Sequence, residues 1–98
     1  MNIQAMMKQA QKLQKDMMKS KGEIDEMQFE GKSSFVTVTV KGTKEVVSVK
    51  IDKEEIEKDE IEMLEDMILV AINEANKKVD EITEQKMGKY TQGMPGLF

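Results

Sequence analysis

The stretch FVTVTVKGTKEVVSVKI, residues 35–51, decides the fold. Valine and threonine alternate in its first half, and apolar and polar residues alternate again after residue 45, which is typical of strands with one buried face. The loop Gly42-Thr43-Lys44 separates the two runs and predicts an antiparallel hairpin. Val46 interrupts the polar face. The other face is apolar and needs a helix to cover it; it consists of Val36, Val38, Val40, Val47, Val49 and Ile51.

The segment before the hairpin has the periodicity of a helix. Apolar or small residues recur every three or four positions, at Ile3, Met6, Ala10, Leu13, Met17, Ser20, Ile24 and Met27. We expect a helical arm over residues 1–22, because Gly22 weakens the continuation of the helix. Residues 28–34 can then supply a short edge strand and a turn, so that an antiparallel sheet occupies residues 27–51.

A second helical pattern follows the hairpin. Two capping boxes are expected at its start, Asp52 with Glu55 and Asp59 with Glu62. Helical spacing of the apolar residues then predicts a long helix over residues 59–87; these residues are Ile61, Leu64, Ile68, Ala71, Ala75, Val79 and Ile82. Residues 88–98 hold three glycines and the only proline, and we interpret them as a tail anchored by Leu97 and Phe98.

The chain is therefore predicted to be one α+β domain, residues 1–98. A long N-terminal helix leads into a small three-stranded antiparallel sheet, and a long C-terminal helix follows. One small sheet offers too little apolar surface to cover two long helices, and a chain of this length buries only a modest core. A homodimer is the expected solution.

The composition argues against an enzyme. The chain contains no histidine, cysteine, arginine or tryptophan, which removes the commonest general base, thiolate nucleophiles and the usual zinc ligands. Paired carboxylates such as Glu54-Glu55 would need an apolar pocket to act as acid and base, and they fall where a solvated helix start is expected. We expect no metal, no cofactor and no small-molecule substrate.

No part of the sequence suggests a membrane protein. The longest apolar run, residues 67–72, is far too short to span a bilayer. Lysines from Lys8 to Lys21 interrupt any apolar core of a signal peptide. Without cysteine, the chain is compatible with a reducing cytosol.

Positive charge is concentrated in the predicted arm. Residues 1–22 hold five lysines and one acid, net +4, whereas residues 23–98 hold ten lysines and eighteen acids, net −8. Four of the lysines recur at helical spacing opposite the apolar positions; we call Lys8, Lys12, Lys15 and Lys19 the lysine stripe. It would be about 17 Å long, enough to neutralise several phosphates of one DNA strand. From composition alone, the ordinary solvated face of an amphipathic helix is the commoner explanation of such a stripe. Lys86 and Lys89 form a second, smaller cluster.

Four segments of the chain resemble the YbaB/EbfC family of nucleoid-associated proteins. The matching segments are Met6-Met7-Lys8-Gln9-Ala10-Gln11-Lys12-Leu13-Gln14, the hairpin Val38–Gly42 with Val49–Asp52, Glu62–Ile68 with Ala71, Asn73 and Ala75, and Lys86–Lys89 through Gly93, Pro95 and Gly96. Together they cover nearly the whole chain in order. The sequence departs from the family pattern at Lys32–Phe35, where glycines are usual, and at Lys53, where a proline is common.

The resemblance implies a tweezer-like homodimer in the cytoplasm and nucleoid, which binds double-stranded DNA with little sequence preference and influences nucleoid organisation or gene expression. It makes Lys8, Lys12, Lys15 and Lys19 the first candidates for DNA contact, with Lys86 and Lys89 behind them. Lysine acts as a point charge, so the contacts would be to the phosphate backbone. The alternative is a helical-arm adaptor or chaperone-like module that grips a protein partner through methionine-rich edges, including Met7 and Met18.

Overall fold

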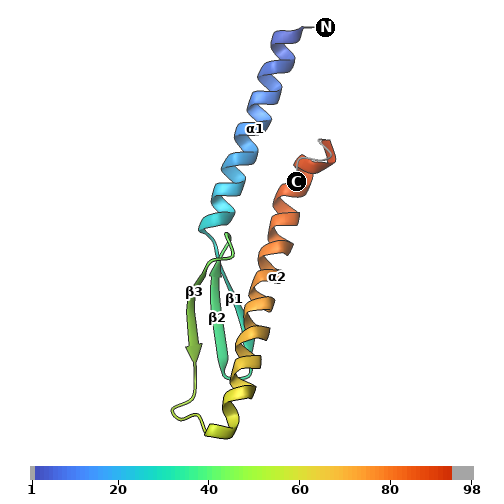
Figure 1. The fold of residues 1–98 in the computed structure, drawn as a ribbon. Helices are drawn as coiled ribbons and strands as arrows, with labels where there is room; N and C mark the ends of the chain where they lie inside the picture. Colours follow the sequence, from blue (N-terminus) through green and yellow to red (C-terminus); the bar gives the residue numbers. More distant parts are fainter. Residues whose placement is uncertain (1, 94–98) are drawn as a thin grey trace.

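The computed structural model describes residues 2–93 and confirms the predicted order of helix, sheet and long helix (Figure 1). The described part of the chain is elongated, 71 × 20 × 14 Å. The two helices run antiparallel, and the sheet lies beside the first half of the second helix. The expected anchoring by Leu97 and Phe98 falls outside the described residues.

Helix α1 spans Ile3–Glu26. Asn2 caps it, because its side-chain oxygen accepts hydrogen bonds from the backbone N–H groups of Gln4 (3.0 Å) and Ala5 (3.4 Å). The expected end near Gly22 is wrong by one turn. A glycine inside a helix costs about 1 kcal/mol, whereas full burial of Ile24 contributes roughly 1.5–3 kcal/mol and extends the helix past it.

The sheet has three antiparallel strands in the order β1-β2-β3: β1 is Gln28–Ser33, β2 is Val36–Lys41 and β3 is Val46–Ile51. The predicted apolar face of β2 is confirmed, since Val36, Val38 and Val40 are fully buried. A bulge between Thr39 and Val40 changes the register on β3, so that Val46 lies opposite Val40. Val46 therefore lies on the apolar face, whereas strict alternation would place it on the polar face.

Helix α2 spans Ile61–Gly93 and follows a short 3-10 helix, η1, at Lys58–Glu60. The expected boundaries of this helix, residues 59–87, are wrong at the C-terminal end. The helix continues to Gly93 because Met87 and Tyr90 are buried against α1. At its start, neither expected capping box sets the boundary. Instead, the carboxylate of Glu60 accepts a hydrogen bond from the Glu57 backbone N–H (3.3 Å).

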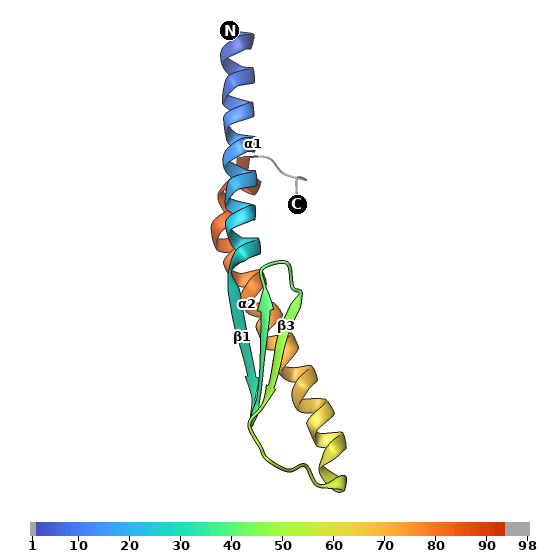
Figure 2. The ribbon, with the colours of Figure 1, turned by 90° about the vertical axis from the view of Figure 1, so that its left-hand side faces the viewer.

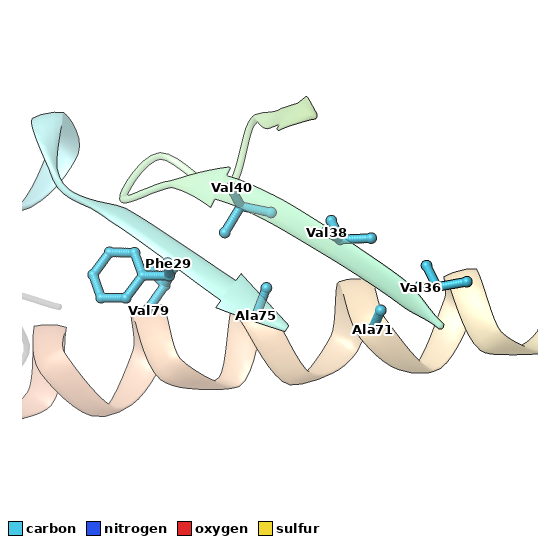
Figure 3. Packing of buried hydrophobic residues seen from close by; sticks show 7 residues of the cluster. All are labelled: Phe29, Val36, Val38, Val40, Ala71, Ala75 and Val79. Atoms are coloured by element: carbon cyan, nitrogen blue, oxygen red, sulfur yellow. The ribbon is translucent and has the colours of Figure 1, made fainter. Parts of the chain in front are cut away.

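The main core lies between α2 and strands β1 and β2 (Figure 3). Small residues allow the helix to approach the sheet closely: a Cβ on Gly31 would lie 1.9 Å from the carbonyl oxygen of Ala71. The buried cluster consists of Phe29, Val36, Val38, Val40, Ala71, Ala75 and Val79. Helix α2 does not cover strand β3, and all six residues of β3 are exposed. The helix expected to cover the hairpin therefore covers only one of its strands.

Candidate nucleic-acid interface

The first half of α1 projects beyond the rest of the protein (Figure 2). Every residue from 3 to 12 is exposed, and the seam with α2 begins at Leu13 and Met17. Apolar residues of the outer seam therefore have no cover from the described chain; Ile3 is 71% exposed and Met6 is 53% exposed. We call residues 3–20 the arm; residues 3–12 project beyond α2, and residues 13–20 lie along it.

The base of the arm is held by a small core of its own. Ile24 packs with Met87 and Tyr90 of α2, and all three side chains are buried. Ser20, the single polar residue of the seam, lies 3.4 Å from the hydroxyl oxygen of Tyr90, within hydrogen-bonding distance. Two polar groups that would be costly to bury separately thus satisfy each other. The α2 helix thereby fixes the direction in which the arm projects.

The lysine stripe lies on the arm and faces away from this seam. A period of 3.6 residues places its four members on the side of the helix opposite Leu13 and Met17, and all four are exposed. Among residues 2–93, none of the four forms an ion pair. In contrast, Lys21 binds Asp25 at 2.5 Å and Lys44 binds Asp80 at 2.8 Å. The stripe therefore presents uncompensated positive charge to solvent.

The two lysines of the second cluster lie on the same half of the molecule. Lys86 and Lys89 are exposed on α2, next to Met87 and Tyr90, which pack against α1. The ammonium of Lys89 lies 5.1 Å from the centre of the Tyr90 ring, close enough for a cation–π contact. They extend the basic end of the molecule from α1 to α2.

The opposite end of the molecule is acidic. Carboxylates gather around η1 and the first turns of α2; they are Glu54, Glu55, Glu57, Asp59, Glu60, Glu62, Glu65 and Asp66. Because the chain is elongated, this cluster and the arm lie at the two ends of the long axis (Figure 1). A polyanion would be attracted to the arm and repelled from the far end.

The acidic residues do not form a recognisable catalytic or metal site. Glu54, Glu55, Glu65 and Asp66 are exposed. A hydrogen bond from Lys53 lowers the pKa of Glu60, which is opposite to the shift that a general acid needs. Within residues 2–93, no group of three or more acidic side chains is placed to hold a metal ion. Nor does that part of the chain contain a helix long and apolar enough to span a bilayer.

Two surfaces are more specific than the sequence pattern predicts. One is the exposed apolar surface of β3 and α2: the pattern predicts surface for a second copy to cover, but not that β3 is the strand left uncovered. The other is a pocket at the base of the arm, lined by Met17, Met18, Lys21, Gly22, Asp25 and Met87. It depends on how α1 packs against α2, which the sequence pattern does not specify.

A family model and several curated proteins match nearly the whole chain. A family model, the YbaB/EbfC DNA-binding family, matches residues 1–94. A nucleoid-associated protein of Ligilactobacillus salivarius is 43% identical over 99% of this chain and 95% of its own length. A nucleoid-associated protein of Lactococcus lactis is 45% identical over 97% of this chain and 98% of its own length. A nucleoid-associated protein of Clostridium novyi is 46% identical over 100% of this chain and 90% of its own length. These names describe DNA-associated proteins rather than enzymes. The chain belongs to the YbaB/EbfC DNA-binding family.

Proposed function

We propose that this protein binds double-stranded DNA as a homodimer through the phosphate backbone, with little sequence preference, and so influences nucleoid organisation or gene expression. The observation that carries the proposal is the lysine stripe: four exposed lysines on a projecting arm, without an ion-pair partner in the described chain. Membership of a DNA-binding family supports it. The names of the relatives support a location in the nucleoid, and hence in the cytoplasm.

The mechanism involves positioning on the DNA and no chemical reaction. Each ammonium group that approaches a phosphate displaces condensed counterions, and the entropy of their release favours binding. Lysine lacks the planar fork that arginine uses to read base edges, so contacts by the stripe carry no sequence information. Lys86 and Lys89 would add contacts where the DNA passes α2. The acidic residues around η1 would repel DNA, so DNA would bind near the arms.

The homodimer is supported by apolar surface that the single chain leaves exposed. The large exposed side chains of β3 and α2 are Val46, Val47, Val49, Ile51, Ile61, Met63, Leu69 and Val70. Helix α2 covers β1 and β2 but not β3. A second copy that covers β3 would bury this surface and would hold two arms in a tweezer-like arrangement. Large exposed apolar surfaces are typical of interfaces between proteins.

The decisive experiment reverses charge on the stripe. The double substitution Lys12→Glu with Lys15→Glu should abolish duplex binding and leave the dimer intact, because both side chains are exposed. The matched control is Lys32→Glu with Lys58→Glu, which changes the net charge equally at the end of β1 and in η1. Fluorescence anisotropy with a labelled duplex measures both. Equal loss in the two variants, or none in the first, would refute the assignment of these lysines.

The alternative, an adaptor that grips a protein, is favoured by one observation. Met7 and Met18 on the arm are 56% and 66% exposed, and flexible thioether side chains suit variable apolar partners. Affinity capture after nuclease treatment separates the two functions. Recovery of a defined protein by a variant that no longer binds DNA would favour the adaptor.

A further inference from the structure

The outer half of the apolar seam of α1 has the pattern of a helix–helix contact and is exposed. We call Ile3, Met6 and Ala10 the outer seam; they have the same spacing of three and four residues as Leu13 and Met17, which pack against α2. Ile3 is 71% exposed, Met6 is 53% exposed, and Ala10 is exposed as well. The outer seam thus continues an interface that α2 covers only from Leu13 onward.

The residues that lie beside the outer seam carry no charge. They are Asn2, Met7 and Gln9, whereas Lys8 and Lys12 lie on the opposite side of the helix. Phosphates and acidic proteins are attracted to that opposite side, where the lysine stripe lies. A second outer seam meets no like charge here, because its own lysines also face away. The surface therefore fits a second copy of the same helix better than it fits DNA or an acidic partner.

Helix α2 decides the direction in which two arms can pair. It runs antiparallel to α1 and lies on the seam side of the arm from Leu13 to the base (Figure 1). Two arms paired in parallel would bring both α2 helices into the same space between them. In the antiparallel direction, Ile3 of the second arm lies opposite Leu13, where α2 ends its cover, and the overlap is about 15 Å long. The helix dipoles also favour this direction.

We propose that the outer seam is a docking site for the outer seam of a second copy, in the antiparallel direction, with Met6 of each copy against Ala10 of the other. This contact is separate from the proposed homodimer through β3 and links one homodimer to the next, so that link rests on the proposed function. Both lysine stripes stay on the outside of the pair. The overlap is too short for a stable interface, which buries roughly 1,200–2,000 Å², so the contact is weak and forms at high protein concentration.

The absence of natural cysteine makes the contact testable by cross-linking. In a mixture under mild oxidation and without DNA, Met6→Cys chains should form disulfides mainly with Ala10→Cys chains, because the two positions face each other. The matched control is a mixture of Gln4→Cys and Gln11→Cys chains, whose substitutions lie on the side away from the seam. Mass spectrometry identifies the pairs.

Two results of the cross-linking would overturn the proposal. One is a yield no higher than that of the control mixture. The other is an excess of disulfides between two Met6→Cys chains, because that pairing requires parallel arms.

A second measurement needs no cysteine. Light scattering without DNA should show species larger than the homodimer as the protein concentration rises, and Met6→Glu should remove them by placing carboxylates in the contact. Gln4→Glu is the control, because it adds the same charge on the opposite side of the helix. Rising salt should leave this association intact, since it depends on apolar contact, although salt weakens DNA binding. Equal species in Met6→Glu and the natural chain, or equal loss in Gln4→Glu, would refute the contact.

These measurements separate a failure of this contact from a failure of the proposed function. DNA is absent throughout, so loss of the lysine stripe as a DNA interface changes neither result. If the homodimer through β3 does not form, the smallest species is the monomer, and Met6→Glu should still remove the paired one. If Met6→Glu abolishes binding of a defined protein and leaves the size of the purified species unchanged, the outer seam serves a foreign partner and the proposal is wrong.

Discussion

At the scale of single residues, two glycines set how closely the elements approach one another. A Cβ on Gly31 would lie 1.9 Å from the Ala71 carbonyl oxygen, and one on Gly42 would lie 1.8 Å from that of Ile24. In both cases the obstacle is backbone, which cannot rotate out of the way as a side chain can. The first contact fixes the sheet against α2, and the second fixes the β2–β3 turn against the base of the arm.

Replacing Gly31 should therefore destabilise the fold. We expect Gly31→Ala to cost about 1–3 kcal/mol or more in free energy of unfolding, because overpacking moves backbone in the main core. Gly88→Ala is the control, since a Cβ at Gly88 would meet nothing within 4 Å and alanine favours a helix by up to ~1 kcal/mol. Urea unfolding followed by circular dichroism measures both. A Gly31→Ala variant as stable as the control would show that the approach of α2 to β1 is not tight.

A second residue-scale prediction concerns acid stability. The Lys53 ammonium bonds to Glu60 and lowers the pKa of that carboxyl below its ordinary value of 4.5; it also lies 5.3 Å from the centre of the Phe35 ring. A carboxyl whose pKa is lower in the folded state stabilises the fold above its unfolded pKa, and this stabilisation is lost as the pH falls through the lowered value. The melting temperature should thus fall less on acidification in Glu60→Gln than in the natural chain.

Glu54→Gln provides the comparison for the acid-stability prediction. Glu54 is exposed and forms no ion pair in the described chain. Calorimetry of the three proteins between neutral pH and pH values below 4.5 measures the difference. If Glu60→Gln and Glu54→Gln lose melting temperature in parallel, the bond between Lys53 and Glu60 does not contribute to acid stability.

At the scale of elements, α1 performs two tasks on opposite faces. Its inner face packs against α2 from Leu13 to Ile24, and its outer face carries the lysine stripe. The inner contact is short, so the outer part of the helix depends on its own hydrogen bonds and on the Asn2 cap. Because α1 is one continuous helix, the Cα atoms of the four stripe lysines keep a fixed spacing, and the flexible side chains place the ammonium groups.

The number of phosphates neutralised by α1 can be measured from salt dependence. If all four stripe lysines of both protomers contact phosphates, log affinity should fall with log salt concentration with a slope of about −7. Replacing one of them by glutamine, for example Lys12→Gln, should reduce the magnitude of the slope by about 1.8, which is two contacts per dimer. Lys32→Gln should leave it unchanged. A slope unaffected by Lys12→Gln would remove that side chain from the interface.

At the scale of the whole molecule, shape and charge act together. The protein is a rod with a basic arm at one end, an acidic turn at the other, and a sheet in the middle whose third strand is exposed. This distribution separates the surface proposed to contact DNA from the one proposed to contact a second copy. The two proposals can accordingly be tested with different variants.

Dimerisation should depend on the exposed apolar surface. Leu69 is 59% exposed and Val49 is 46% exposed, so Leu69→Lys with Val49→Lys should spare the protomer fold and disrupt the dimer. Sedimentation should then change from a mass twice 11.2 kDa to 11.2 kDa. Glu84→Lys, an exposed position near the other end of α2, is the control. A variant that stays dimeric would place the interface elsewhere.

The sequence by itself determined the types and order of the elements. Alternation in residues 36–41 and helical spacing after residue 61 are local patterns, and each reflects one face that must be buried. The whole-chain resemblance and the charge of the arm pointed to the family, which the comparisons confirm. The identification of the individual lysines and of the dimer stays a prediction.

Only the tertiary structure decided where the elements end and which surfaces stay open. Burial of Ile24 and Tyr90 extends both helices beyond the limits that glycine suggested, because contacts between distant segments outweigh local propensity. A bulge of one residue places Val46 on the apolar face, and the path of α2 leaves β3 uncovered. The lysine stripe was visible in the sequence. That it lies on a projecting arm, without ion pairs in the described chain, follows from how α2 packs against only the base of α1.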